Sequence, residues 1–125
     1  MKYFALSPDD SWNVNPQKFA HQLALRWPTV EIEEQTAEDS RYFDFDLRMP
    51  HSRVVGGFAR AGDAFIMEGD LRDCVQLALW FRSIVPPEHP LVFCDEGYAY
   101  DIALTPGTTD AEVFSAFEYT PPGAG

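Results

Sequence analysis

Carboxylate side chains recur at every second position in two nearby segments of the chain. Glu31 and Glu33 alternate with apolar residues in the first segment, and Asp44 and Asp46 do so in the second. Residues two apart in a β-strand lie on the same face, so each pair of carboxylates projects from one side of its strand. Carboxylates grouped in this way serve three kinds of chemistry: metal binding, general acid–base catalysis and ion pairing with basic groups.

Ion pairing is the chemistry that this pattern favours. Metal binding and acid–base catalysis need side chains that converge in a cleft, whereas alternate residues on flat strands project outward in parallel. Two interpretations remain open, a recognition face for a basic partner and an ordinary solvent-facing surface. Like charges directly opposite one another on paired strands are destabilising, which favours recognition unless Arg41 or Arg48 offsets the charge. If the two strands are neighbours, we expect four carboxylates on one face with little to neutralise them.

A second concentration of carboxylates surrounds Glu96-Gly97, which predicts a tight hairpin turn. Tyrosines beside these carboxylates would supply rigid contact area, and the carboxylates would meet Lys or Arg on a partner. An ordinary turn bordered by strand tyrosines fits the same residues equally well. The candidate partner-binding residues from both segments are Glu31, Glu33, Asp44, Asp46, Asp95, Glu96, Tyr98, Tyr100 and Asp101.

Neither cysteine lies in a pattern that indicates catalysis or metal binding. Cys74 and Cys94 each lie within an apolar segment, and Pro90 separates His89 from the strand that contains Cys94. Both are predicted to be buried thiols in a reducing compartment. Gly56-Gly57, inside a predicted strand, indicates a bulge or the close approach of another backbone and not a phosphate-binding loop. The sequence therefore predicts no enzyme, no metal and no cofactor.

The charge of the chain limits the partners that it can attract. Nine basic and twenty acidic residues give a net charge of −11 over 125 residues. This charge repels nucleic acid and anionic membranes, so we expect neither as a partner. Pro8 interrupts the initial apolar residues too early for a signal peptide, and no later apolar run could span a bilayer. We therefore expect a cytoplasmic protein.

The pattern of apolar residues predicts an α+β domain. Alternation predicts strands, and helical spacing after capping residues predicts three helices, the first beginning at Asn15-Pro16, the second at Asp70 and the third at Thr109. The expected strands span residues 2–6, 29–35, 41–49, 53–59, 64–68, 91–95 and 98–104. The order β-α-β-β-β-β-α-β-β-α, with hairpins predominating, predicts a mainly antiparallel sheet with two to three helices on one face.

Length and composition predict one domain over residues 1–119 and a flexible tail over 120–125. Ten phenylalanines and a hydrophobic content of 46% are sufficient for a continuous core. The residues expected inside that core are Val30, Ile32, Phe43, Phe45, Leu47, Val75, Leu79, Phe81, Val92 and Ile102. Glu31, Glu33, Asp44 and Asp46 are expected outside, because a register shift of one residue would invert every assignment.

The leading functional hypothesis is a small acidic inhibitor, a bacterial immunity-type protein that neutralises a basic toxin or effector domain by direct binding. Its basis is a compact acidic domain with aromatic residues among its surface charges and without a recognisable catalytic set. One alternative is a small-molecule-binding or enzymatic domain with a pocket between sheet and helices, lined by Trp12, Trp27 and Trp80. Another is an adaptor subunit of a larger bacterial complex.

Overall fold

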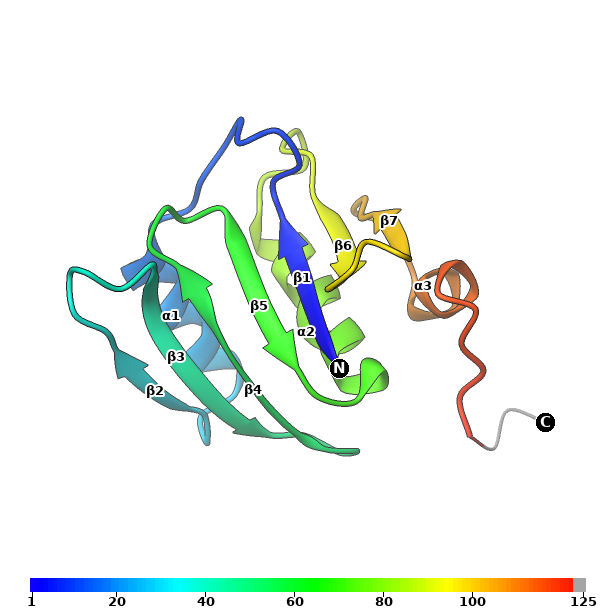
Figure 1. Cartoon of the computed structure of the whole chain (residues 1–125), viewed down its shortest axis with the longest axis horizontal. Coiled ribbons are helices and arrows are strands. Elements are labelled where there is room, and N and C mark those ends of the chain that lie inside the picture. The colour runs from blue at the N-terminus through cyan, green and yellow to red at the C-terminus, as the bar shows by residue number, and fades with distance from the viewer. Residues whose placement is uncertain (123–125) are drawn as a thin grey trace.

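A computed structural model describes residues 1–122, which form one seven-stranded antiparallel sheet and three helices (Figure 1). The elements are β1 Lys2–Leu6, α1 Pro16–Arg26, β2 Glu31–Glu34, β3 Arg41–Arg48, β4 Arg53–Ala59, β5 Ala64–Glu68, α2 Leu71–Ile84, β6 Val92–Asp95, β7 Asp101–Ala103 and α3 Asp110–Ala116. The predicted α+β class and the predicted order of elements are confirmed. The predicted tail includes residues 123–125, which lie outside the described residues.

Each helix begins at the capping residue that the sequence predicts. The side chain of Asn15 accepts hydrogen bonds from the N–H groups of Gln17 and Lys18, and Pro16 occupies the first helical position. Asp70 caps α2 in the same way, and Thr109 caps α3. These side chains satisfy N–H groups that have no carbonyl partner within their own helix, which fixes where each helix starts.

The strands lie in the order β2-β3-β4-β5-β1-β6-β7, so β1 is an interior strand between β5 and β6. Figure 1 looks onto one face of the sheet, with α1 and α2 behind it and α3 beyond β7. Phe117, at the end of α3, has its ring 5.3 Å from that of Phe93 and 6.1 Å from that of Tyr3. All three helices therefore pack on the same face, and within residues 1–122 the opposite face has no helix over it. We call that opposite face the open face.

Aromatic rings fill the space between the sheet and the helices. The ring of Phe19 from α1 lies 4.2 Å from that of Phe58, 5.0 Å from that of Phe65 and 5.1 Å from that of Phe81. Phe58, Phe65 and Phe81 are fully buried. Tilted and edge-to-face contacts of this kind add to the stabilisation that burial of the rings provides. The covered face is thus held by direct contacts between large apolar side chains.

Half of the predicted inward and outward positions are confirmed, seven of fourteen. Phe43, Phe45, Leu47, Val75 and Phe81 are buried, and Glu31 and Glu33 are exposed. Five residues expected in the core are only partly buried: Val30, Ile32, Leu79, Val92 and Ile102.

Two of these differences have a clear physical reason. Ile32 lies on β2, at the edge of the sheet, where burial is incomplete. Val92 pairs with Leu6, whose neighbour Ala5 is fully buried, so Val92 lies on the open face and Phe93 takes the buried position. The prediction therefore placed Val92 on the wrong face of β6.

Besides Asp95, two charged residues are buried without an ion-pair partner in residues 1–122, and the sequence analysis did not predict their burial. The guanidinium of Arg82 donates to the backbone carbonyls of Val85, Pro86, His89 and Leu104. Asp73, at the start of α2, accepts from the backbone N–H of His51 and the hydroxyl of Ser52. These side chains fasten the loop after α2 and the turn before β4 to the body of the domain.

Candidate functional site

The open face brings the four strand carboxylates together. Glu31 on β2 is the direct cross-strand neighbour of Asp46 on β3, and Glu33 is the neighbour of Asp44. Such neighbours have their Cβ atoms about 5 Å apart on the same side of the sheet. The predicted grouping of these four residues is therefore present in the structure, at the edge of the sheet that ends with β2.

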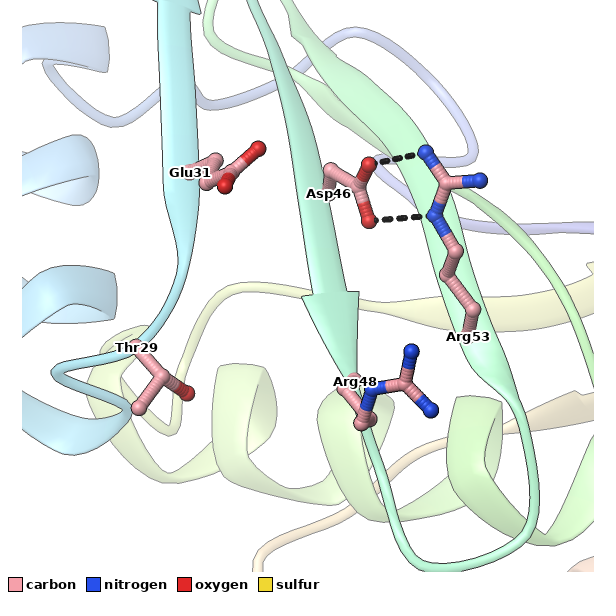
Figure 2. A pocket seen from close by; sticks show the side chains of 5 residues that line it. All are labelled: Thr29, Glu31, Asp46, Arg48 and Arg53. Carbon is pink, nitrogen blue, oxygen red and sulfur yellow. Dashed lines mark hydrogen bonds and ion pairs between the residues drawn. The ribbon is translucent and has the colours of Figure 1, made fainter.

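Each aspartate has an arginine beside it, which corrects the expectation that little neutralises the four carboxylates. Arg53 on β4 makes two hydrogen bonds to the carboxylate of Asp46, one of them 2.8 Å from Nε to Oδ1 (Figure 2). Arg41 donates to Oδ1 of Asp44 at 3.1 Å, and Gln35 donates to the other oxygen at 3.1 Å. Asp44 and Asp46 are consequently half-buried, whereas we expected them to be exposed.

The bond from Arg53 changes the acidity of Asp46. Hydrogen bonding by the guanidinium stabilises the ionised carboxylate and lowers the pKa of Asp46 below its ordinary value. The same contact raises the pKa of Arg53. Asp46 therefore keeps its negative charge at a lower pH than an unpaired aspartate would.

Gly57 leaves space for the ion pair of Arg41 with Asp44. The pairing of β3 with β4 is irregular between Arg41 and Phe43. A Cβ atom on Gly57 would lie 2.9 Å from Cδ of Arg41 and 2.9 Å from an oxygen of Asp44. At Gly56 a Cβ atom would lie 2.0 Å from the carbonyl oxygen of Ile66, which confirms the predicted close approach of a neighbouring backbone.

On β2, the carboxylates of Glu31 and Glu33 are open to a partner. Both are exposed on the edge strand β2, and within residues 1–122 neither forms an ion pair. Arg48 is exposed as well and lies directly opposite Arg53. The surface therefore carries charges of both signs. The unpaired carboxylates lie on the edge strand β2, and the paired carboxylates lie on the neighbouring strand β3.

The charged groups surround a connected series of hollows. A hollow of about 570 Å³ is lined by Thr29, Glu31, Asp46, Arg48 and Arg53 (Figure 2). A second hollow, of about 420 Å³, shares Glu31 and Asp46 with it and continues past Glu33 and Asp44 to Val55. Within residues 1–122 no group of three or more histidine, cysteine or acidic side chains is placed to hold a metal ion. This arrangement suits the exchange of ion pairs and hydrogen bonds with a basic surface.

The second predicted group, around Glu96-Gly97, contains the predicted turn within a longer loop than expected. Glu96-Gly97 forms a hydrogen-bonded turn, in which the N–H of Tyr98 donates to the carbonyl of Asp95 at 3.1 Å, but residues 98–100 extend it into a loop before β7. Tyr98 adopts the left-handed conformation with φ of 56°. Asp95 is only 8% exposed, because its carboxylate accepts a hydrogen bond from the N–H of Tyr100. The side chain of Asp95 therefore holds the loop together, and its contact with a partner stays a prediction.

The other residues of this loop are exposed to different degrees. Tyr98 is 59% exposed, and Glu96 lies 3.6 Å from the ammonium group of Lys2. The hydroxyl of Tyr100 donates to Glu118 at 3.1 Å, and its ring stacks on Phe117. Asp101 is exposed at the start of β7. β4, β5 and β1 separate these residues from β3, so the two predicted groups lie at opposite ends of the sheet.

Both cysteines are buried, as predicted. Burial raises the pKa of Cys74 to about 12 and also raises the pKa of Cys94. The imidazole of His89 stacks on the indole of Trp12, with 5.6 Å between the ring centroids. Both thiols are therefore protonated at neutral pH and behave as apolar core groups.

Arg53 is the residue of this site that the sequence analysis missed. A signal for it was present, because a short turn after Arg48 sets the register of β4 and places Arg53 diagonally beside Asp46. The helices of residues 1–122 include none long and apolar enough to cross a membrane. Comparison of the chain with protein-family models, with curated proteins and with solved structures gives no match.

Proposed function

We propose that this protein binds a basic protein partner through the open face at β2 and β3 and blocks it, as an immunity-type inhibitor of a toxin or effector domain. The observation that carries the proposal is the pairing of Glu31 with Asp46 and of Glu33 with Asp44, on a face that the helices leave uncovered. A basic side chain that enters the hollow meets carboxylates from two adjacent strands.

The rigidity of the site favours tight binding. Asp44 and Asp46 are held in place by Arg41 and Arg53, so little side-chain entropy is lost when a partner contacts them. The net charge of −11 attracts a basic partner over a distance and speeds its association.

The arginines in the site make it selective among basic partners. Arg48 and Arg53 repel a surface that carries positive charge alone. A partner with basic groups opposite Glu31 and Glu33 and an acidic group opposite Arg48 would complement the whole pattern. Discrimination of this kind suits an inhibitor that must recognise one effector among many basic proteins.

The test is a salt series of association rates with the product of a neighbouring gene that co-purifies with the protein. The variant Glu31→Lys/Glu33→Lys should bind that partner about tenfold more weakly or worse, because charges in contact contribute on the order of 1 kcal/mol or more each. Its matched control, Glu38→Lys/Glu88→Lys, makes the same change of charge at exposed loop residues.

The association rate of the wild type should fall as salt rises, because exposed charges are screened over about 8 Å at physiological ionic strength. The control variant should lose only the long-range part of the attraction and keep the affinity that comes from contacts. Salt-independent rates, together with equal affinities for the two variants, would contradict the proposal.

A further inference from the structure

The open face continues beyond the carboxylates into a hollow that has both apolar and charged residues in its lining. This third hollow, of about 190 Å³, lies over β4 and β5 and is lined in part by Val55, Gly56 and Ile66. It shares Asp44 and Val55 with the second hollow, so the two are continuous. Its volume is sufficient for one aliphatic side chain.

The apolar residues of this hollow have no cover in the structure of residues 1–122. Val55 on β4 and Ile66 on β5 are half-buried on the open face and lie diagonally across the paired strands, since Val55 pairs with Glu68 and Ile66 pairs with Gly57. Gly57, the cross-strand neighbour of Ile66, has no side chain, which leaves a depression in the surface beside Ile66. Four charged residues also line the hollow: Arg41 and Asp44 from β3, Glu68 from β5 and Lys2 from β1.

We infer that this hollow is the anchor point for a single apolar side chain of the basic partner, an inference that rests on the proposed function. Protein interfaces derive most of their affinity from a few apolar anchors that a polar rim shields from water. Here Val55 and Ile66 form the apolar centre, and the carboxylates of β2 and β3 form the rim on one side.

The spacing of the strands defines the partner segment. Two interstrand steps of about 4.8 Å separate β2 from Val55 on β4, and three separate it from Ile66 on β5, which places the far side of the anchor about 14 Å from Glu31 and Glu33. About four residues of extended chain cover that distance. The segment therefore carries an apolar residue about four positions from its basic residues.

A second copy of the chain is not the occupant. Each copy carries a net charge of −11, and contact through this face would bring the carboxylates of two copies together. Like charges in contact oppose association. The carboxylates beside the hollow favour a basic segment of a partner as the occupant.

The test uses two short lysine-rich peptides as probes, one with leucine and one with serine about four positions after the last lysine. Calorimetric titration at low salt should show that the wild type binds the leucine peptide about fivefold more tightly, the effect of partly burying one leucine side chain. Val55→Gln should remove this preference. Val92→Gln, the same change at a half-buried position outside the hollow, should retain it.

Thermal unfolding of each variant checks its fold, and Ile66→Thr serves in place of Val55→Gln if that variant does not fold. Equal binding of the two peptides by the wild type, or a leucine preference that survives Val55→Gln, would overturn the anchor. If both peptides still bind in a salt-dependent manner, the proposed function is unaffected. Absence of binding by both peptides also overturns the anchor, and the Glu31→Lys/Glu33→Lys series then decides the proposed function separately.

Discussion

The two faces of the sheet are built from different interactions. On the covered face, rings such as those of Phe19 and Phe58 lie in direct contact and are closed to water. On the open face, Asp46 and Arg53 form an ion pair whose side chains are 30% and 65% exposed. Buried aromatic contacts contribute several kcal/mol, whereas exposed ion pairs contribute about 0–1 kcal/mol. The comparison indicates that the covered face stabilises the fold. Charged residues on the open face contribute little to stability and can therefore vary with the needs of binding.

The largest expected effect comes from removing an aromatic ring on the covered face. Phe58→Ala should lower the free energy of unfolding by about 3–5 kcal/mol, because Phe58 is fully buried and its loss leaves a cavity. Phe4→Ala, the same substitution at a half-buried position on the open face, should cost clearly less. Denaturant titrations of both variants measure the difference, and equal losses would remove the distinction between the two faces.

A buried charge gives the next largest effect. Burial lowers the pKa of Arg82, but its guanidinium has backbone carbonyls as hydrogen-bond acceptors. Arg82→Met leaves those carbonyls without a donor and should reduce stability by about 3 kcal/mol. Arg72→Met, which removes a partly exposed ion pair with Asp70, should cost about 1 kcal/mol or less. A small effect at Arg82 would show that water replaces its hydrogen bonds.

The smallest effect concerns the acidity of Asp46. Replacement of its partner, Arg53→Met, should raise the pKa of Asp46 toward the ordinary value of 3.8, as followed by carboxyl carbon NMR. Arg48→Met is the control, since Arg48 acts on Asp46 through charge alone and should shift that pKa less. An unchanged titration of Asp46 in Arg53→Met would show that the ion pair is not maintained in solution.

The sign of the linkage follows from the direction of the shift. Because the folded protein lowers the pKa of Asp46, the stability that this ion pair contributes is present above the ordinary pKa. It is lost as the pH falls from that value through the lower pKa of the folded state. In Arg53→Met, the free energy of unfolding should therefore decrease less as the pH falls through this range.

Local signals in the sequence predicted the fold better than they predicted the site. Asn15, Asp70 and Thr109 act on N–H groups within three residues of themselves, so their roles can be inferred without knowledge of the tertiary structure. Alternation likewise identified β3 and its buried face.

The site depends on contacts that local patterns do not specify. The ion pair of Asp46 with Arg53 requires the register of two strands, and the burial of Asp95 requires the conformation of the loop through Tyr100. A carboxylate beside tyrosines looks the same in sequence whether it faces a partner or accepts a bond from its own backbone.

The interior position of β1 has a consequence for how the domain forms. Lys2 pairs with Glu68, and Tyr3 pairs with both Met67 and Asp95, so β1 joins β2–β5 to β6–β7 in one hydrogen-bonded sheet. Contacts between residues so distant in sequence slow folding, because a long loop must close before they form. The ladders of β1 with β5 and β6 therefore close the largest loops in the sheet. A chain that lacks β1 offers two complementary strand edges, and a separate peptide with the β1 sequence could restore the sheet.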